Sequence, residues 1–182
     1  MRDNLVARLK RPDVAYLLPQ APGRSWYGGR FNAPVVELEP SLSAALTTVA
    51  LAVVVARERG AAVVLVGFSQ GACLVAELLA REGRLGLAGA AVLTGALIGE
   101  RSCAGEVRRL GVSLDGLPVE IVSSALDEWV GEQYVRAAAR SLAEAGAAVH
   151  LQITAEPEHR VEDTGVTAVA RLLYGAAGTT VS

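Results

Sequence analysis

A serine stands at the centre of a short pattern that could present a nucleophile. In the stretch VVLVGFSQGACL, from Val63 to Leu74, aliphatic residues lead into Gly67, Ser69 follows, and Gly71 comes two residues later. The pattern Gly-x-Ser-x-Gly between a strand and a helix is typical of a sharp turn that exposes the serine hydroxyl, because bulky neighbours would clash there. The backbone N–H of Gln70, at the start of the helix, would then face an oxyanion.

Such a serine needs elements that bring a base and an acid to it. Apolar runs bounded by turn residues alternate with longer amphipathic stretches, and this alternation predicts an α/β fold with a mostly parallel sheet flanked by helices. Strands are expected at Val14–Leu18, Ala62–Val66, Ala88–Leu93, Val119–Ser123 and Val149–Thr154. Helices are expected at Ser41–Arg59, with Ser41 as N-cap, and at Gly71–Glu82, Gly131–Ala145 and Thr164–Tyr174, with a short one at Arg101–Leu110.

The strand ends distinguish between the two histidines of the chain. In a parallel sheet, chemistry belongs beyond the carboxyl ends of the strands, where the loops converge. His150 lies at the start of the last strand, roughly 15 Å from that edge at ~3.3 Å per residue, so we interpret it as structural. His159 lies in the loop AEPEHRVED after the same strand, and we predict that it is the base.

The same rule selects the acid. Asp115 precedes a strand, whereas Asp127 follows the strand VEIVSS in the loop ALDEWV, with Glu128 as its nearest competitor. Ser69, Asp127 and His159 then occur in the chain order of an α/β-hydrolase triad. In such a triad the serine attacks an acyl carbonyl, the histidine takes and returns the proton, and the aspartate orients the imidazole.

Aromatic residues gather near the predicted site. Trp26, Tyr27 and Phe31 lie in the loop after the first expected strand, and Phe68 and Trp129 flank the predicted nucleophile and acid. Trp26, Tyr27, Phe68 and Trp129 could line an apolar pocket for an acyl or aryl group of a small-molecule substrate. Alternatively, the residues SWY anchor a long loop to the core.

Composition limits the class of protein. The chain has 182 residues, 52% of them hydrophobic and 20% charged, with a net charge of -2. We expect one domain over residues 1–182, with a frayed tail at 175–182. The sequence has no basic stripe that would suggest a nucleic acid partner. It also has no G-x-G-x-x-G motif and no phosphate-loop lysine that would suggest a nucleotide site.

The sequence predicts neither a targeting segment nor a metal site. The charged N-terminus lacks a secretory apolar core, and the apolar run at Ala44–Ala56 is shorter than the ~20 residues that span a bilayer. We therefore expect a cytoplasmic protein with no stable membrane insertion. Cys73 and Cys103 have no metal-ligand spacing, so buried free thiols and no metal site are expected.

A resemblance to a known family rests on the order and spacing of the segments YLLPQAPGRSWY, VVLVGFSQGACL, LTGALIG, ALDEWV and EHRV. They resemble the phospholipase/carboxylesterase group of α/β-hydrolases, which includes the acyl-protein thioesterases, over about residues 12–165. The resemblance implies Ser69 as nucleophile, Asp127 as acid, His159 as base and the Gln70 amide as an oxyanion donor. It also implies hydrolysis of carboxylic esters, and in some members of thioesters or lysophospholipids, with no metal or organic cofactor.

The resemblance further implies an N-terminally truncated chain. Family members have, upstream of the region resembling MRDNLVARL, a strand ending in a His-Gly loop that supplies a second oxyanion donor, and losing one such donor typically costs ~10²–10³ in turnover. A start codon lies upstream, or the first strand pairs directly with the strand before Ser69, or a partner chain fills the gap, as in a homodimer. We expect a serine carboxylesterase for small or medium-chain acyl esters; the alternative is a catalytically impaired relative that binds an acyl ligand or a protein.

Overall fold

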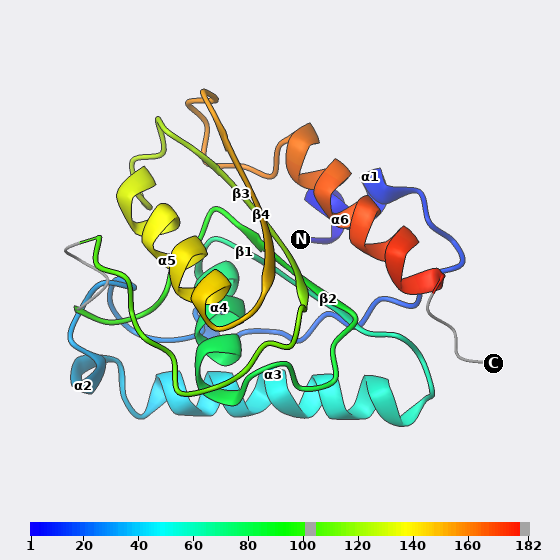
Figure 1. Cartoon of the computed structure of the whole chain (residues 1–182), viewed down its shortest axis with the longest axis horizontal. Coiled ribbons are helices and arrows are strands. Elements are labelled where there is room, and N and C mark those ends of the chain that lie inside the picture. The colour runs from blue at the N-terminus through cyan, green and yellow to red at the C-terminus, as the bar shows by residue number, and fades with distance from the viewer. Residues whose placement is uncertain (101–104, 179–182) are drawn as a thin grey trace.

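A parallel sheet of four strands forms the centre of the computed structural model, which describes residues 1–100 and 105–178 (Figure 1). The strands are β1 (Val64–Phe68), β2 (Gly89–Leu93), β3 (Pro118–Ser124) and β4 (Ala148–Thr154), in the spatial order β1-β2-β3-β4. Each neighbouring pair is parallel. The carboxyl ends of all the strands therefore meet at one edge of the sheet.

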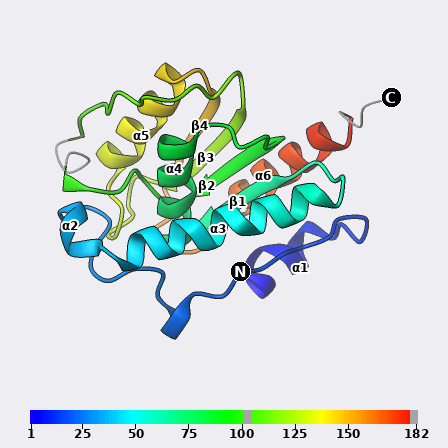
Figure 2. The ribbon, with the colours of Figure 1, turned by 90° about the horizontal axis from the view of Figure 1, so that it is seen from below.

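Helices cover both faces of this sheet (Figures 1 and 2). α4 (Gln70–Glu82) packs on β1 and β2, and α5 (Glu132–Glu144) packs on β3 and β4 of the same face. α6 (Asp163–Ala177) packs on the opposite face, and α3 (Ser41–Glu58) packs against α4. The shorter helices are η1 (Arg2–Val6), α1 (Ala7–Leu9), η2 (Pro22–Arg24) and α2 (Val35–Leu38).

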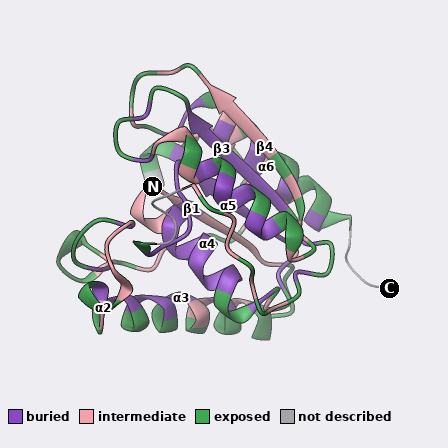
Figure 3. Ribbon diagram, turned by 60° about the vertical axis from the view of Figure 1, so that its left-hand side comes forward, coloured by how far each residue is buried: buried purple, intermediate pink, exposed green. Residues whose placement is uncertain are grey.

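Helix α4 lies within the core and is buried along most of its length (Figure 3). Its residues from Ala72 to Ala80 are all buried, because the helix lies between the sheet and α3 and also contacts α5. A helix that is apolar on most of its sides needs such cover. The element that follows the predicted nucleophile is thus held by packing on several sides.

One charged side chain lies inside this core. Glu77, on α4, is 2% exposed. Its carboxylate accepts hydrogen bonds from Arg81 Nε at 2.7 Å, from an Arg108 guanidinium nitrogen at 3.0 Å and from the backbone N–H of Ile98 at 3.2 Å. These partners offset the cost of burying the charge, and they fasten the segment after β2 to α4.

Most of the predicted elements are confirmed, with small shifts at their ends. The strands expected from Ala62 onward are β1 to β4, and the long helices expected after Pro40 are α3 to α6. Ser41 is not the N-cap of α3 but its first residue, and its hydroxyl donates to Leu38 O at 2.7 Å. The carboxylate of Glu39 instead accepts from the backbone N–H of Ser43 at 3.1 Å.

The strand predicted at Val14–Leu18 is wrong. These residues are not part of the sheet, and the side chains of Tyr16 and Leu17 are exposed. A strand needs a neighbour that pairs with its backbone, and β1 pairs with β2 alone among the described strands. The apolar run is therefore a loop here.

Two further expectations need correction. Residues 105–110 of the helix expected at Arg101–Leu110 are not helical, because the Arg108 N–H donates to Ser141 Oγ at 2.8 Å and its guanidinium binds Glu77; residues 101–104 lie outside the described residues. The tail does not fray at Gly175, since α6 continues to Ala177. Residues 179–182 also lie outside the described part.

Helix α3 is the described helix that is long and apolar enough to cross a membrane, with a mean hydropathy of 1.5 over 18 residues. A core helix of a soluble protein passes the same test. The residues that α3 buries in the structure are Leu42, Ala45, Leu46, Val49 and Val53.

Candidate active site

Ser69 occupies the turn between β1 and α4 with a strained backbone. Its φ is 55° and its ψ is -124°, a conformation that few residues with a side chain adopt. The turn is fixed on both sides, since the Ser69 N–H donates to Leu93 O at 3.0 Å and the Ser69 carbonyl accepts from the N–H groups of Ala72 at 2.8 Å and Cys73 at 3.0 Å. The geometry is that expected of a serine presented at a sharp strand-to-helix turn.

The two glycines of the pattern are not equivalent. A Cβ at Gly67 would lie 2.2 Å from the carbonyl oxygen of Gly71, so only glycine fits there. A Cβ at Gly71 would meet only Trp26 Nε1, at 3.9 Å. The steric reason predicted for both glycines therefore holds at Gly67 and not at Gly71.

His159 connects the serine to the predicted acid. Its Nε2 lies 2.8 Å from Ser69 Oγ, and its Nδ1 lies 2.7 Å from Asp127 Oδ2. An ionised carboxylate can only accept, so Nδ1 carries the proton and Nε2 is left to accept the hydroxyl proton of Ser69. The two contacts have the arrangement that a Ser-His-Asp triad requires.

Asp127 is held in place by its own loop. Its Oδ1 accepts hydrogen bonds from the backbone N–H groups of Trp129 and Val130, both at 2.8 Å. Oδ2 is then turned to His159, and the side chain is 2% exposed. Glu128, its competitor in the sequence, is exposed.

His150 lies elsewhere, on β4. Its Nδ1 is 2.8 Å from the Glu120 carboxylate and 2.9 Å from a guanidinium nitrogen of Arg171. Glu120 lies on β3, and Arg171 lies on α6. His150 thus contacts a separate ionic cluster, away from the strand ends.

The aromatic residues form two groups. Phe68 and Trp129 flank the imidazole of His159, with ring centroids at 5.1 Å and 6.2 Å, and Trp129 is 63% exposed. Both rings therefore lie beside the predicted base, and the Trp129 ring is open to solvent.

Trp26 and Tyr27 instead belong to a loop that the side chain of Gln70 binds. Gln70 Oε1 accepts from the Trp26 N–H at 2.8 Å, and its Nε2 donates to Tyr27 O at 2.9 Å and to Ser25 Oγ at 3.3 Å. Tyr27 is buried in the core beside Cys73, and burial raises the pKa of the phenol and raises that of the Cys73 thiol to about 11.

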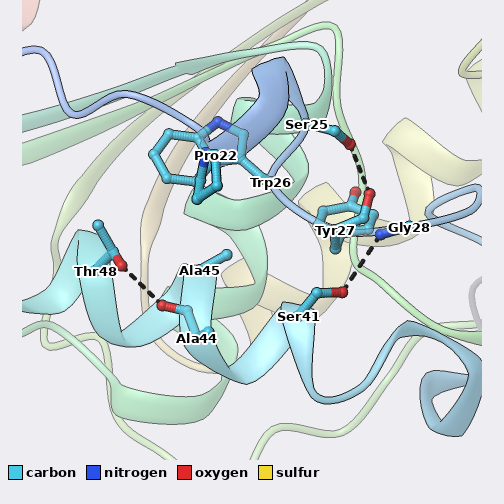
Figure 4. A pocket seen from close by; sticks show the side chains of 9 residues that line it. All are labelled: Pro22, Ser25, Trp26, Tyr27, Gly28, Ser41, Ala44, Ala45 and Thr48. Carbon is cyan, nitrogen blue, oxygen red and sulfur yellow. Dashed lines mark hydrogen bonds between the residues drawn. The ribbon is translucent and has the colours of Figure 1, made fainter.

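A cavity of about 340 Å³ lies between this loop and the first half of α3. Figure 4 shows Trp26 and Pro22 on one side of it and α3 on the other. Its lining residues are Pro22, Ser25, Trp26, Tyr27, Gly28, Ser41, Ala44, Ala45 and Thr48. The lining carries hydroxyl groups but no charged side chain.

Gln70 begins α4 directly after Ser69. The first N–H groups of a helix have no carbonyl partner within the helix, and their partial positive charge favours an anion. This position is the one predicted for an oxyanion donor.

The histidine loop, residues 155–162, is held by contacts that no local sequence pattern indicates. At its far end Thr154 Oγ1 donates to Glu162 at 2.9 Å, and the Arg8 guanidinium donates to Val161 O. Within the loop Arg160 pairs with Glu156 and Glu158 at 3.4 Å and 3.0 Å, so their negative charges are offset. No arrangement that could hold a metal ion is found among the described residues.

The fold is similar to those of known proteins whose structures have been solved. The structure is similar to the crystal structure of a phospholipase/carboxylesterase from Dyadobacter fermentans DSM 18053, with 30% identity and a TM-score of 0.76 over 85% of this chain and 74% of that chain. A carboxylesterase from Mesorhizobium loti matches with 25% identity and a TM-score of 0.63, over 87% and 72% of the two chains. Arabidopsis thaliana SOBER1 F65L shares the fold, with 19% identity, a TM-score of 0.73 and coverage of 97% and 92%. Neither a protein-family model nor a curated protein sequence matches the chain.

Proposed function

Because the chain belongs to the phospholipase/carboxylesterase family of α/β-hydrolases, we propose that it is a serine carboxylesterase that hydrolyses small or medium-chain acyl esters. The observation that carries the proposal is the hydrogen-bond chain from Ser69 through His159 to Asp127. It combines a nucleophile, a base and an orienting acid at the distances that general base catalysis requires. No metal or organic cofactor takes part in the proposed steps.

In the first step, Ser69 Oγ attacks the carbonyl carbon of the ester while His159 Nε2 takes its proton. The former carbonyl oxygen of the tetrahedral intermediate becomes negative and faces the backbone N–H of Gln70, at the start of α4. The bond between the acyl carbon and the oxygen of the leaving alcohol then breaks, and protonated Nε2 gives its proton to the alcohol oxygen. Asp127 keeps Nδ1 protonated and stabilises the imidazolium during both transfers.

In the second step, water repeats these transfers on the acyl-enzyme. His159 takes a proton from the water molecule, whose oxygen attacks the acyl carbon, and the proton returns to Ser69 Oγ as the carboxylic acid leaves. Atoms and charges balance over the cycle. One ester and one water give one acid and one alcohol.

The proposed substrates are uncharged near the reacting bond. Phe68 and Trp129 border the imidazole, and apolar rings suit an alkyl or aryl group better than a charged one. The open position of Trp129 is compatible with leaving groups of different size.

A fluorophosphonate probe tests the proposal, because it forms a covalent phosphonyl ester with an activated serine and releases fluoride. We expect labelling of the wild type and none of Ser69→Ala, while Ser43→Ala, with an exposed serine on α3, is labelled as the wild type is. Hydrolysis of p-nitrophenyl acetate and butyrate should follow the same pattern. A folded wild type that is neither labelled nor active would instead favour a catalytically impaired acyl- or protein-binding relative.

A further inference from the structure

We infer that Ser124 is a positioning residue of this site. Its hydroxyl fastens the histidine loop to the acid loop. Ser124 is the last residue of β3. The acid loop, residues 125–131, follows it directly, and the histidine loop, residues 155–162, follows the neighbouring strand β4. The inference rests on the esterase function proposed above.

The hydroxyl of Ser124 uses both of its hydrogen-bonding abilities. Its proton is donated to the carbonyl oxygen of Glu156, in the histidine loop, and its oxygen accepts from the backbone N–H of Leu126, in the acid loop, at 3.0 Å. Ser124 is 3% exposed, so water does not replace these bonds at low cost. One side chain thus joins the loops that carry Asp127 and His159.

Among the described residues, no other hydrogen bond ties the first half of the histidine loop to the sheet. Among the hydrogen bonds and ion pairs of the described residues, those of Glu158 stay within the loop, and the far end is held at Val161 and Glu162. The Ser124 bond to Glu156 O is what joins residues 155–158 to the sheet. His159 follows immediately after this stretch.

Small displacements of His159 matter because its ring must meet two partners at once. Nε2 lies 2.8 Å from Ser69 Oγ and Nδ1 lies 2.7 Å from Asp127 Oδ2. A shift of ~1 Å in a catalytic group can lower the rate ~100-fold. The Ser124 hydroxyl therefore acts on the rate through His159 without touching the substrate.

The neighbouring serine is a matched control. Ser123 lies on the same strand, is 0% exposed and has a side-chain oxygen without a hydrogen-bond partner in the described structure. Successive residues of a strand point to opposite faces, so its hydroxyl lies on the other side of β3. Removing it breaks no hydrogen bond.

The experiment compares Ser124→Ala and Ser124→Cys with Ser123→Ala, using the whole chain and p-nitrophenyl butyrate. Alanine leaves the space of the hydroxyl empty, whereas cysteine fills it with a somewhat larger group that hydrogen-bonds weakly. A loss shared by both variants therefore reflects the lost hydrogen bonds rather than a change in packing. We expect kcat to fall ~10- to 100-fold in both Ser124 variants, with KM changed less than twofold, and to stay within twofold of the wild type in Ser123→Ala. Equal kcat in the wild type, Ser124→Ala and Ser123→Ala would overturn the inference.

A spectroscopic readout tests the inference without activity. The proton shared by His159 Nδ1 and Asp127 should give a low-field proton NMR signal in the wild type and in Ser123→Ala, and this signal should broaden or vanish in Ser124→Cys. If the wild type proves inactive and unlabelled, the proposed function fails but this comparison still decides the role of Ser124. A signal of equal width in all three proteins contradicts it.

Discussion

His159 Nε2 lies 2.8 Å from Ser69 Oγ although 90 positions of sequence separate the two residues. They meet because Ser69 follows β1 and His159 follows β4, and the carboxyl ends of parallel strands share one edge of the sheet. Asp127, after β3, reaches the same edge. The contact between these distant residues is thus a consequence of strand direction.

The first prediction concerns the orientation of His159. Asp127→Asn should lower kcat ~10⁴-fold, because an amide can donate to Nδ1 and so favour the wrong tautomer of the imidazole. Steady-state kinetics with p-nitrophenyl butyrate measures this. Glu128→Gln is the matched control, since Glu128 is adjacent but exposed, and a similar loss in both variants would contradict the role of Asp127.

The second prediction concerns the loop that carries Trp26. Gln70→Ala removes three hydrogen bonds to residues 25–27, so this loop should open more often and trypsin should cleave after Arg24 several times faster than in the wild type. Mass spectrometry of timed digests identifies the cleavage site. Gln133→Ala, which changes an exposed glutamine on α5, should digest at the wild-type rate, and equal cleavage of the two variants would show that the Gln70 side chain does not hold the loop.

The third prediction concerns the charged group in the core. Glu77→Ala should lower the free energy of unfolding by about 3 kcal/mol, because Arg81, Arg108 and the Ile98 amide lose a buried partner. Urea titration measures the change. Glu82→Ala removes an exposed carboxylate from the same helix and should cost less than ~1 kcal/mol; a loss of that size in Glu77→Ala would mean that the buried ion pairs add little.

The fourth prediction concerns alkaline pH. Burial raises the pKa of Cys73 from 9.0 to about 11. At a pH between these two values, the thiol therefore loses its proton in the unfolded protein and keeps it in the folded protein. The free energy of unfolding should therefore fall as pH rises, by about 2 kcal/mol from this group. Its contribution is fully present below pH 9.0.

Urea titrations near neutral pH and at about pH 10.5 measure this slope. Cys73→Ala should show a shallower fall, although the raised pKa of Tyr27 acts in the same direction in both proteins. Identical slopes in wild type and variant would exclude Cys73 as a source of alkaline instability.

Much of the candidate site could be predicted from sequence, because it depends on the order of residues and strands along the chain. Whether an acid or a histidine comes before or after an apolar run decides at which end of a parallel sheet it lies, and this alone separated His159 from His150 and Asp127 from Asp115. The strand-helix order also follows from local patterns. These features need no knowledge of long-range contacts.

Other features depend on neighbours that no local pattern encodes. The apolar run at Val14–Leu18 reads as a strand, but a strand also requires a paired backbone beside it. The side chain of Gln70 binds a loop more than 40 positions away, and Ser124 differs from Ser123 only in the partners that it finds. The alternation of a strand places the two serines on opposite faces, but it does not say which face meets the histidine loop.

The burial of α4 has a consequence for how the protein loses activity. The helix that begins after Ser69 is covered on most sides, whereas half of the residues in the loop that carries His159 are exposed. Local opening occurs first where few buried contacts resist it. On warming, the imidazole should therefore leave the serine in a reversible, partial transition, so that inactivation precedes melting of the sheet and activity returns on cooling.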